Sequence, residues 1–181
     1  ATRLAMAQRE VGLTIGEPPT TKGYTPSVFS LLQKTMERAG TSEKGSITGL
    51  YSVLVEADDI NDPISDASRG ILDGHVVLSR KLASMGHYPA IDVLESISRV
   101  RNDVIDLDHY EAAAKIQEMM AAYRNSEDLI SVGAYQRGVN PKVDRAIAMN
   151  DRINQFLRQR IDEASYFERT VDDLKKLAGV K

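Results

Sequence analysis

Patterns that predict β-strands occur only in the first part of the chain, and this division most limits the possible folds. Residues 46–55 are rich in β-branched and aromatic side chains and predict a buried strand, and residues 74–78 predict a second, shorter one. From residue 107 onward, apolar side chains recur at helical spacing without a strand pattern. We therefore expect an α/β fold class, with an α/β part over residues 1–106 and an all-helical part over residues 107–181.

Start and stop signals predict several helices in the α/β part. Residues 3–15 form a helical pattern with Leu4, Ala7, Val11 and Ile15 on one face, and Gly16 ends it. Because no capping residue precedes this pattern, we expect the element to start upstream of the given sequence. Thr25 followed by proline starts a further helix, which ends at Gly40. Shorter helices are expected over residues 64–72 and 79–85.

Three helices are expected in the all-helical part. Asp108 with Glu111 resembles a capping box, which would start the first of them. Asn140 followed by proline starts the second, and residues 163–177 form the third, more polar helix.

Composition excludes several classes of function. The net charge of −3 lacks the basic excess of a nucleic-acid-binding protein, so we expect no nucleic-acid partner. With no cysteine, disulfides and thiolate chemistry are excluded, and the cytoplasm is the default location. No apolar run reaches the ~18 residues of a membrane span.

Arg99 is the candidate catalytic residue. A planar guanidinium can offer two parallel donors to the oxygens that gain charge during phosphoryl transfer, an effect worth about 10³–10⁵ in rate. From the spacing alone, an arginine at a strand end held by a surface ion pair is the favoured interpretation, and Arg101 is a competing guanidinium two residues away. The chain has no G-x-x-x-x-G-K-[ST] motif to hold phosphates.

Other candidates have ordinary structural alternatives. The loop over residues 16–24, rich in glycine and proline, is either a contact surface or a simple connection. Phe156 is either a core residue or the wall of an adenine pocket. The acidic residues Glu56, Asp58, Asp59 and Asp62 could bind a cation, but their spacing fits capping and turn chemistry better, so no metal site is expected.

Several segments together resemble the ATPases of bacterial type III export, which are related to the subunits of rotary F-type ATP synthases. The resemblance is nearly continuous over residues 2–100 and weaker beyond. The segments that carry it are Arg3-Leu-Ala-Met-Ala-Gln-Arg-Glu10, Gly16-Glu-Pro-Pro19, Lys22-Gly-Tyr24, Val53-Leu-Val-Glu-Ala-Asp-Asp59, Ile71-Leu-Asp-Gly-His-Val-Val-Leu-Ser-Arg80 and Gly86-His-Tyr-Pro-Ala-Ile-Asp92. The variants Thr-Lys-Gly-Tyr, Ser-Arg-Gly-Ile-Leu and Val-Gly-Ala-Tyr are more similar to the flagellar branch.

The resemblance implies a fold. In this family the segment that starts at Thr2 follows the Walker B strand, so this chain would lack the phosphate loop, the Walker B aspartate and the ligands of Mg²⁺. It would comprise the C-terminal part of a RecA-like P-loop NTPase domain followed by the helical C-terminal domain.

The resemblance also implies site residues. Arg99 would be an arginine finger that acts on ATP held by the neighbouring subunit of a homohexamer. Glu17, Lys22, Gly23 and Tyr24 would contact a coiled-coil central stalk protein in the pore. Phe156 and Gln159 would close the adenine side of the pocket. Leu54 stands where the catalytic subunits of ATP synthases carry a tyrosine against the adenine, so stacking would be weaker or come from elsewhere.

The implied activity is ATP hydrolysis with Mg²⁺, coupled to chaperone release and protein export at the inner-membrane export apparatus. Further partners would be a peripheral stalk or regulator protein, export chaperone–substrate complexes and a membrane export gate. This part alone would be inactive because it has no phosphate-binding residues. Alternatives are an injectisome ATPase, an F- or V-type ATP synthase subunit, or a non-catalytic helical interaction module derived from the family.

Overall fold

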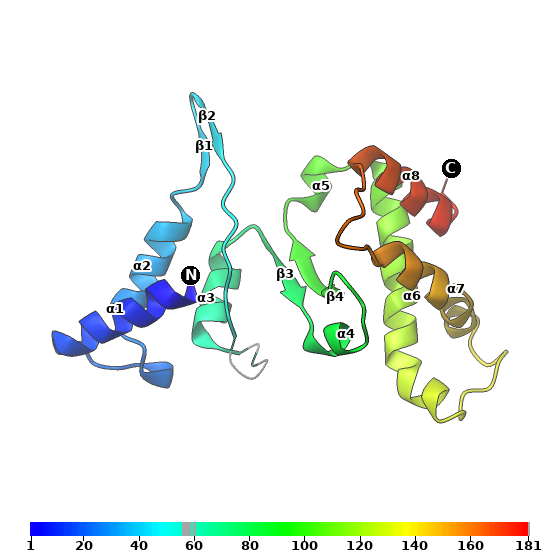
Figure 1. Ribbon diagram of the computed structural model, residues 1–181, viewed down its shortest axis with the longest axis horizontal. Coiled ribbons are helices and arrows are strands. Elements are labelled where there is room, and N and C mark those ends of the chain that lie inside the picture. Colours follow the sequence, from blue (N-terminus) through cyan, green and yellow to red (C-terminus); the bar gives the residue numbers. More distant parts are fainter. Residues whose placement is uncertain (56–58, 60, 181) are drawn as a thin grey trace. The chain divides into compact units, whose positions relative to one another are not determined.

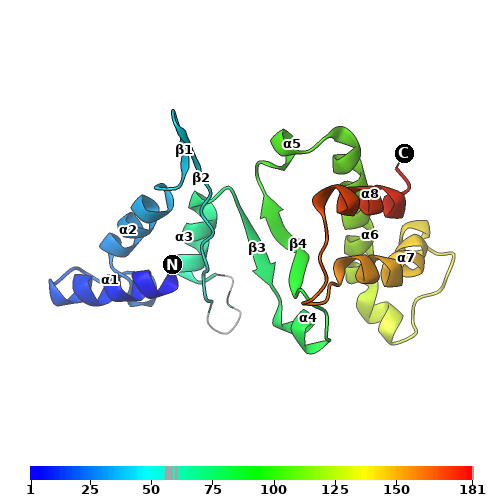
Figure 2. The ribbon, with the colours of Figure 1, turned by 45° about the horizontal axis from the view of Figure 1, so that its top comes forward.

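The computed structural model describes residues 1–55, 59 and 61–180. By its internal contacts the chain divides into two compact units, Ala1–Asp73 and Gly74–Lys181. Each unit is described by itself below and can be followed by its colour in Figures 1 and 2. No helix within the described residues is both long and apolar enough to cross a membrane.

In its described residues, the first unit contains three α-helices, one 3₁₀ turn and one short strand pair (Figure 1). Its elements are α1 (Thr2–Thr14), the 3₁₀ turn η1 (Thr21–Gly23), α2 (Pro26–Met36), β1 (Gly40–Ser42), β2 (Gly45–Ile47) and α3 (Pro63–Ile71). The strands β1 and β2 pair antiparallel, with Gly40 opposite Ile47. The predicted start at Thr25 and the predicted helix over residues 64–72 are confirmed, the latter capped by the Asp62 carboxylate.

The core of the first unit lies between its helices. Its buried apolar side chains are Ala5, Tyr24, Val28, Leu32, Met36 and Ile64. At the crossing of α1 and α2, a Cβ on Gly12 would lie 2.3 Å from the Thr25 hydroxyl oxygen, so only glycine permits this approach. The helices, not the strands, therefore hold this unit together.

The prediction of a buried strand over residues 46–55 is wrong. Strand β2 ends at Ile47, its three residues are exposed, and residues 48–55 have no regular secondary structure. Leu50 is 95% exposed. Strand formation needs a neighbouring strand, and within the described residues only β1 pairs there. Instead, the Leu54 amide donates to the Thr2 hydroxyl at 2.8 Å, and the amino group of Ala1 donates to the Ser52 carbonyl at 2.9 Å.

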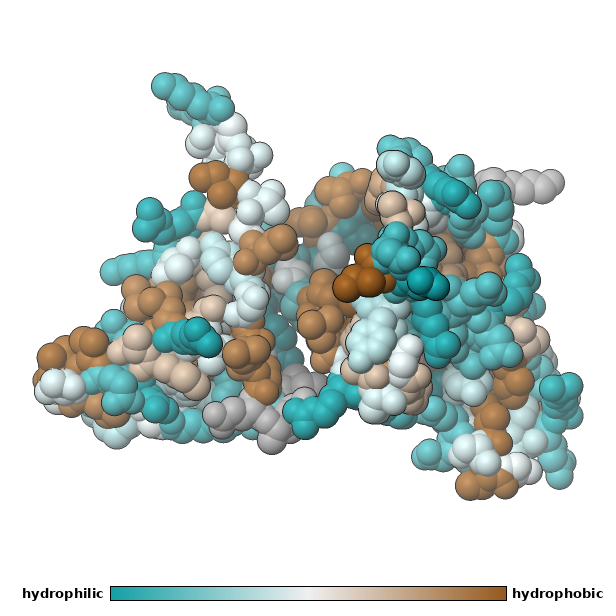
Figure 3. Space-filling view, in the orientation of Figure 1, coloured by the Kyte–Doolittle hydropathy of each residue, from teal (hydrophilic) through white to brown (hydrophobic). Residues whose placement is uncertain are grey.

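Helix α1 buries its less apolar side. Its extent agrees with the predicted helix, and Gly16 follows it with a φ of +83°. The buried residues, however, are Thr2, Ala5 and Gly12, whereas the predicted apolar face carries exposed side chains such as Val11 and Ile15. Figure 3 shows hydrophobic residues gathered at the surface over the end of this helix. The apolar face thus has no cover among the described residues.

The second unit combines a strand pair with a group of helices. Its elements are β3 (Gly74–Leu78), α4 (Arg80–Ser84), β4 (Ile91–Ser98), α5 (Arg101–Val104), α6 (Leu107–Ser131), α7 (Pro141–Leu157) and α8 (Phe167–Ala178). Helix α6 runs along α7 and α8, as both views show (Figures 1 and 2). The predicted strand over residues 74–78 and the predicted helix over residues 79–85 are confirmed, and the described residues from 107 onward contain no strand.

Strands β3 and β4 pair antiparallel with a marked irregularity. His75 lies opposite Ile97, but Val77 lies opposite Asp92. Between these pairs β3 has the single residue Val76, whereas β4 has residues 93–96. We call this extra stretch, residues 93–96, the β4 bulge. Bulges redirect a strand, and this one lies shortly before Arg99.

Three helix boundaries differ from the sequence prediction. Helix α2 ends at Met36, four residues before the predicted end at Gly40, which instead starts β1. Helix α6 is capped by the Asp106 carboxylate, which accepts the His109 amide at 2.7 Å, so the cap lies two residues before the predicted Asp108. Helix α8 starts at Phe167, four residues after the predicted start. The start of α7 at Asn140 is confirmed, since this side chain accepts the Lys142 amide at 3.0 Å. The sequence offers both Asp106 and Asp108 as caps, and in the structure Asp106 is the cap.

Candidate functional site

Arg99 lies in the turn that joins strand β4 to helix α5. Strand β4 ends at Ser98, and helix α5 starts at Arg101. Arg99 is exposed. The fold therefore places this guanidinium at the surface, at the end of a strand, where it can reach a group outside its own unit.

Arg101 is engaged by helix α6. Its Nη1 donates to the Gln117 side-chain oxygen at 3.1 Å, and its guanidinium carbon lies 4.7 Å from the centre of the Tyr110 ring. Such a contact combines a hydrogen bond with a cation–π attraction. Arg101 is only partly exposed and anchors the turn to α6.

The loop over residues 16–24 is braced at its first half. The Glu17 carboxylate accepts the Ser27 amide at 3.2 Å. Hydrogen bonding by the Ser27 side chain is the largest cause that lowers the pKa of Glu17 below its usual value. Glu17 is half-buried. It therefore fixes the loop to the start of α2 and is less available to a partner than an exposed carboxylate.

Lys22 forms the second brace of this loop. It adopts a left-handed conformation, with φ of +53°, and its Nζ donates to Asp59 Oδ2 at 2.6 Å. The Asp62 carboxylate lies 3.7 Å from the same nitrogen. The hydrogen bond to Asp59 raises the pKa of Lys22 and lowers that of Asp59. Lys22 is exposed, so the chain presents this ion pair at its surface.

The other two predicted contact residues differ in exposure. Gly23 is half-exposed, with φ of +73° and open space around its Cα. Tyr24 is buried in the core, with Arg9 5.6 Å above its ring and Phe29 at its edge. Tyr24 therefore anchors the end of the loop in the core of the first unit.

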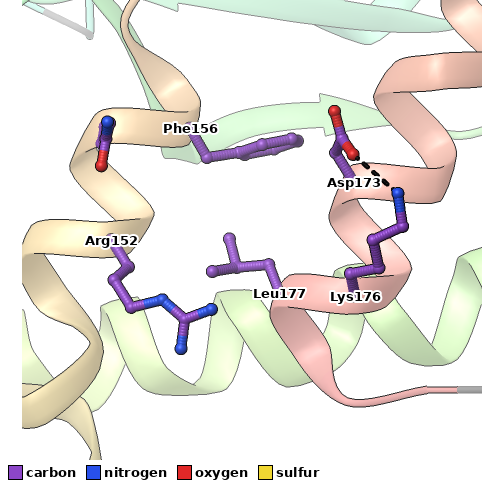
Figure 4. A pocket seen from close by; sticks show the side chains of 6 residues that line it. Arg152, Phe156, Asp173, Lys176 and Leu177 are labelled. Atoms are coloured by element: carbon purple, nitrogen blue, oxygen red, sulfur yellow. Dashed lines mark hydrogen bonds and ion pairs between the residues drawn. The ribbon is translucent and has the colours of Figure 1, made fainter.

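Phe156 lies on α7 and points toward α8. It lines a small open pocket of about 260 Å³ together with Arg152, Gln155, Asp173, Lys176 and Leu177. Figure 4 shows the Phe156 ring beside Leu177, with the Asp173–Lys176 ion pair at 3.1 Å along α8. The ring is half-buried, so it belongs to the contact between these two helices and also faces the pocket.

Gln159 lies after the end of α7, beside a different, wider groove. Its amide donates to the Tyr88 carbonyl at 2.9 Å, and its side chain donates to the Glu163 carbonyl at 2.9 Å. The groove is also lined by Pro89, Asn154 and Arg158. Tyr88 is 57% exposed there. Tyr88 is not among the predicted site residues, and the sequence signal that could have indicated it is an aromatic residue before proline in a turn.

The remaining candidates are separate from these features. Leu54 belongs to the first unit and is 68% exposed. Of the acidic candidates for a cation, Glu56 and Asp58 lie outside the described residues, while Asp59 pairs with Lys22 and Asp62 caps α3. In the part of the chain that the structure describes, no three or more histidine, aspartate or glutamate side chains are grouped to hold a metal ion.

Two family models match consecutive parts of the chain. Residues 1–98 match the ATP synthase alpha/beta family, nucleotide-binding domain. The chain belongs to the ATP synthase alpha/beta family. Residues 105–176 match the C-terminal domain of the type III secretion ATPase EscN. The predicted relationship to flagellar and type III export ATPases is thus confirmed, as is the predicted fold class of an α/β nucleotide-binding part followed by a helical C-terminal domain.

Curated relatives come from both export branches. The flagellum-specific ATP synthase of Bacillus subtilis is 53% identical over 98% of this chain and 41% of its own length. The type 3 secretion system ATPase of Pseudomonas syringae pv. tomato is 51% identical over 98% of this chain and 40% of its own length. The chain therefore spans about 40% of the length of these relatives.

Solved structures share the fold. The assembled ATPase EscN of the enteropathogenic Escherichia coli type III secretion system has a TM-score of 0.93 and 47% identity, covering 98% of this chain and 43% of its own. EscN in complex with its central stalk EscO has a TM-score of 0.86 and 45% identity, covering 98% of this chain and 42% of its own.

Proposed function

We propose that this chain is the C-terminal part of a protein-export ATPase of the type III kind, which hydrolyses ATP as a homohexameric ring. The family match and the relatives at about 50% identity support this proposal. The chain itself would supply an arginine finger, a pore loop and the helical domain. It has no phosphate loop, so alone it would be inactive.

The catalytic proposal assigns the finger to Arg99. MgATP bound to the neighbouring subunit would supply the γ-phosphoryl group, with the metal neutralising charge on the phosphates. The Arg99 guanidinium would donate to the oxygens on which charge grows as the phosphoryl group transfers, which lowers the barrier by roughly 4–7 kcal/mol. The observation that supports this assignment is the exposed position of Arg99 directly after the end of strand β4.

The second unit also offers surfaces for the nucleotide base. The exposed Tyr88 ring beside Gln159 could stack on adenine, and Phe156 would form an apolar wall of its own pocket. Leu54 belongs to the first unit, and its predicted position near the adenine rests on the family resemblance alone. The predicted boundary between the nucleotide-binding and helical domains, after residue 106, stays part of this proposal.

The loop over residues 16–24 would face a coiled-coil central stalk. The complex of EscN with its central stalk EscO supports such a partner. Lys22 and Gly23 at the surface would make the direct contacts, while Glu17 and Tyr24 hold the loop in place. An acidic or polar stripe on the stalk would suit the Lys22 side chain best.

The remaining partners follow from the family proposal. The intact protein would sit in the cytoplasm at the inner-membrane export apparatus. There it would bind a peripheral stalk or regulator protein, chaperone–substrate complexes and the export gate. The Thr-Lys-Gly-Tyr and Ser-Arg-Gly-Ile-Leu variants favour the flagellar branch.

Turnover of the full-length parent protein tests the catalytic proposal. Arg99→Ala and Arg101→Ala are made separately and assayed as assembled rings. We expect Arg99→Ala to lower turnover by about 10³ while rings still form, and Arg101→Ala to act mainly on stability. A loss specific to Arg101→Ala would move the finger to that residue. If neither variant matters, the non-catalytic interaction module becomes the better description.

A further inference from the structure

The β4 bulge is held in shape by side chains of the strand itself. Asp92 Oδ1 accepts the amides of Leu94 at 3.1 Å and Glu95 at 3.2 Å. The Ser96 hydroxyl donates to the Asp92 carbonyl at 2.6 Å and accepts the Val77 amide of β3 at 3.0 Å. Hydrogen bonds within β4 and to strand β3 thus fix the conformation of the bulge.

Arg124 on helix α6 binds two carboxylates of β4, Asp92 just before the bulge and Glu95 within it. Its Nη2 donates to both Asp92 carboxylate oxygens, at 2.7 and 2.9 Å, and its Nη1 donates to Glu95 Oε1 at 3.2 Å. The Asp92 side chain is only 14% exposed. A fork of this kind fixes both distance and orientation, which a single point charge does not. Three hydrogen bonds therefore connect helix α6 to the segment that leads to Arg99.

A second tie joins the same helix to the chain just after Arg99. Arg101 is bound by Gln117, seven residues before Arg124 and so on the same face of α6. Arg99 consequently lies between two anchors, the β4 bulge before it and Arg101 after it, and both reach one helix. The 25-residue length of α6 makes it a stiff platform for both.

We propose that Arg124 is a positioning residue for Arg99, through which helix α6 sets where the guanidinium stands against the neighbouring nucleotide. This inference rests on the proposed finger function of Arg99. A misplacement of about 1 Å can cost about 10²-fold in rate, so a clamp on the preceding strand has a direct kinetic effect. A shift of α6 would also move the finger, which couples the helical domain to catalysis.

The same contacts could instead serve only to stabilise the fold, and kinetics separates the two. In the full-length parent, Arg124→Gln should lower kcat about 10- to 100-fold with KM for ATP unchanged. Arg124→Lys should recover part of the loss because it keeps one charged contact. The control is Glu127→Gln, one helical turn away, which breaks the 3.1 Å pair with Lys81 of α4 without touching the bulge. This control should leave kcat near that of the parent.

Binding of a transition-state mimic tests whether Arg124 acts through the finger. We expect Arg124→Gln to weaken binding of MgADP–fluoroaluminate by the factor lost in kcat, while MgADP binds as before. Equal weakening of both ligands, or the same loss in Glu127→Gln, would overturn the inference. If Arg99→Ala itself leaves fluoroaluminate binding intact, the finger assignment fails first, which distinguishes that failure from a failure of the clamp.

Discussion

The two units use their strand pairs in different ways. In the first unit all six residues of β1 and β2 are exposed, and the buried core lies among α1, α2 and α3. In the second unit Arg124 joins β4 to helix α6, and β3 and β4 approach each other closely at Gly74. Two antiparallel pairs of similar kind thus end as a peripheral hairpin and as the support of the candidate site.

The difference shows what gives a short strand pair its importance. Two strands alone are marginal in water and gain stability from side chains that other elements supply. Contacts from α6 reach β4, whereas the hydrogen bonds described for β1 and β2 lie within the hairpin: their ladder, the bond from the Ser42 hydroxyl to the Gly45 carbonyl at 3.2 Å, and the bond from the Lys44 amide to the Ser42 hydroxyl at 3.4 Å. Four substitutions can break or sharpen this comparison.

The largest effect is expected in the helical core of the first unit. Leu32 is 1% exposed, and Leu32→Ala should lower the free energy of unfolding by about 2–5 kcal/mol through lost burial and a cavity. Peptide-resolved hydrogen exchange would follow the amides of this unit. The control is Leu50→Ala, at a 95% exposed side chain, which should change stability by less than about 0.5 kcal/mol. Comparable losses for both would contradict a core confined to the helices.

The next effect is expected where β3 meets β4. A Cβ on Gly74 would lie 2.5 Å from the Ile97 carbonyl oxygen, so Gly74→Ala should cost about 1–3 kcal/mol as backbone shifts to relieve the clash. Urea denaturation measures it, and Ser46→Ala on the exposed β2 is the matched change. If Ser46→Ala proves as costly as Gly74→Ala, the first strand pair is more than a peripheral hairpin.

A smaller effect is expected at the cap of α3. Asp62 accepts the amides of Ile64 at 3.0 Å and Ser65 at 3.2 Å, and Asp62→Ala should cost about 1 kcal/mol. Asp62→Asn keeps the acceptor and should restore most of the stability in thermal unfolding. Should asparagine be as harmful as alanine, charge rather than capping would be the main contribution, in line with the nearby Lys22.

The smallest effect is a pH dependence from the second unit. Burial lowers the pKa of His87, and the charge of Arg158 lowers it further. The unfolded chain then binds the proton at higher pH than the folded one, so stability falls as pH drops below about 6.5. His87→Gln should reduce the pH dependence of the melting temperature between about pH 7 and pH 5. His109→Gln serves as control, and an unchanged slope in His87→Gln would refute the assignment.

Local sequence signals predicted the helices well. Gly16, the Thr25–Pro26 pair and the Asn140–Pro141 pair mark helix ends in the structure because capping and proline geometry act over a few residues. The strand prediction for residues 46–55 was wrong because an apolar, β-branched segment forms a strand only when a neighbouring strand is present. The predicted apolar face of α1 is exposed for a related reason: a periodic pattern shows which side chains share a face but not which element covers them.

The candidate site divides along the same line. The sequence alone named Arg99 and Arg101 as candidates, gave the family resemblance, and showed that no phosphate loop is present. Only the tertiary structure showed that Arg101 is bound to α6, and only it revealed the contact of Arg124 with Asp92 and the exposed Tyr88 ring, while the choice between the two arginines stays a proposal. Arg124 lies 32 residues from Asp92, a separation that leaves no local pattern, because the contact exists only once helix and strand have packed.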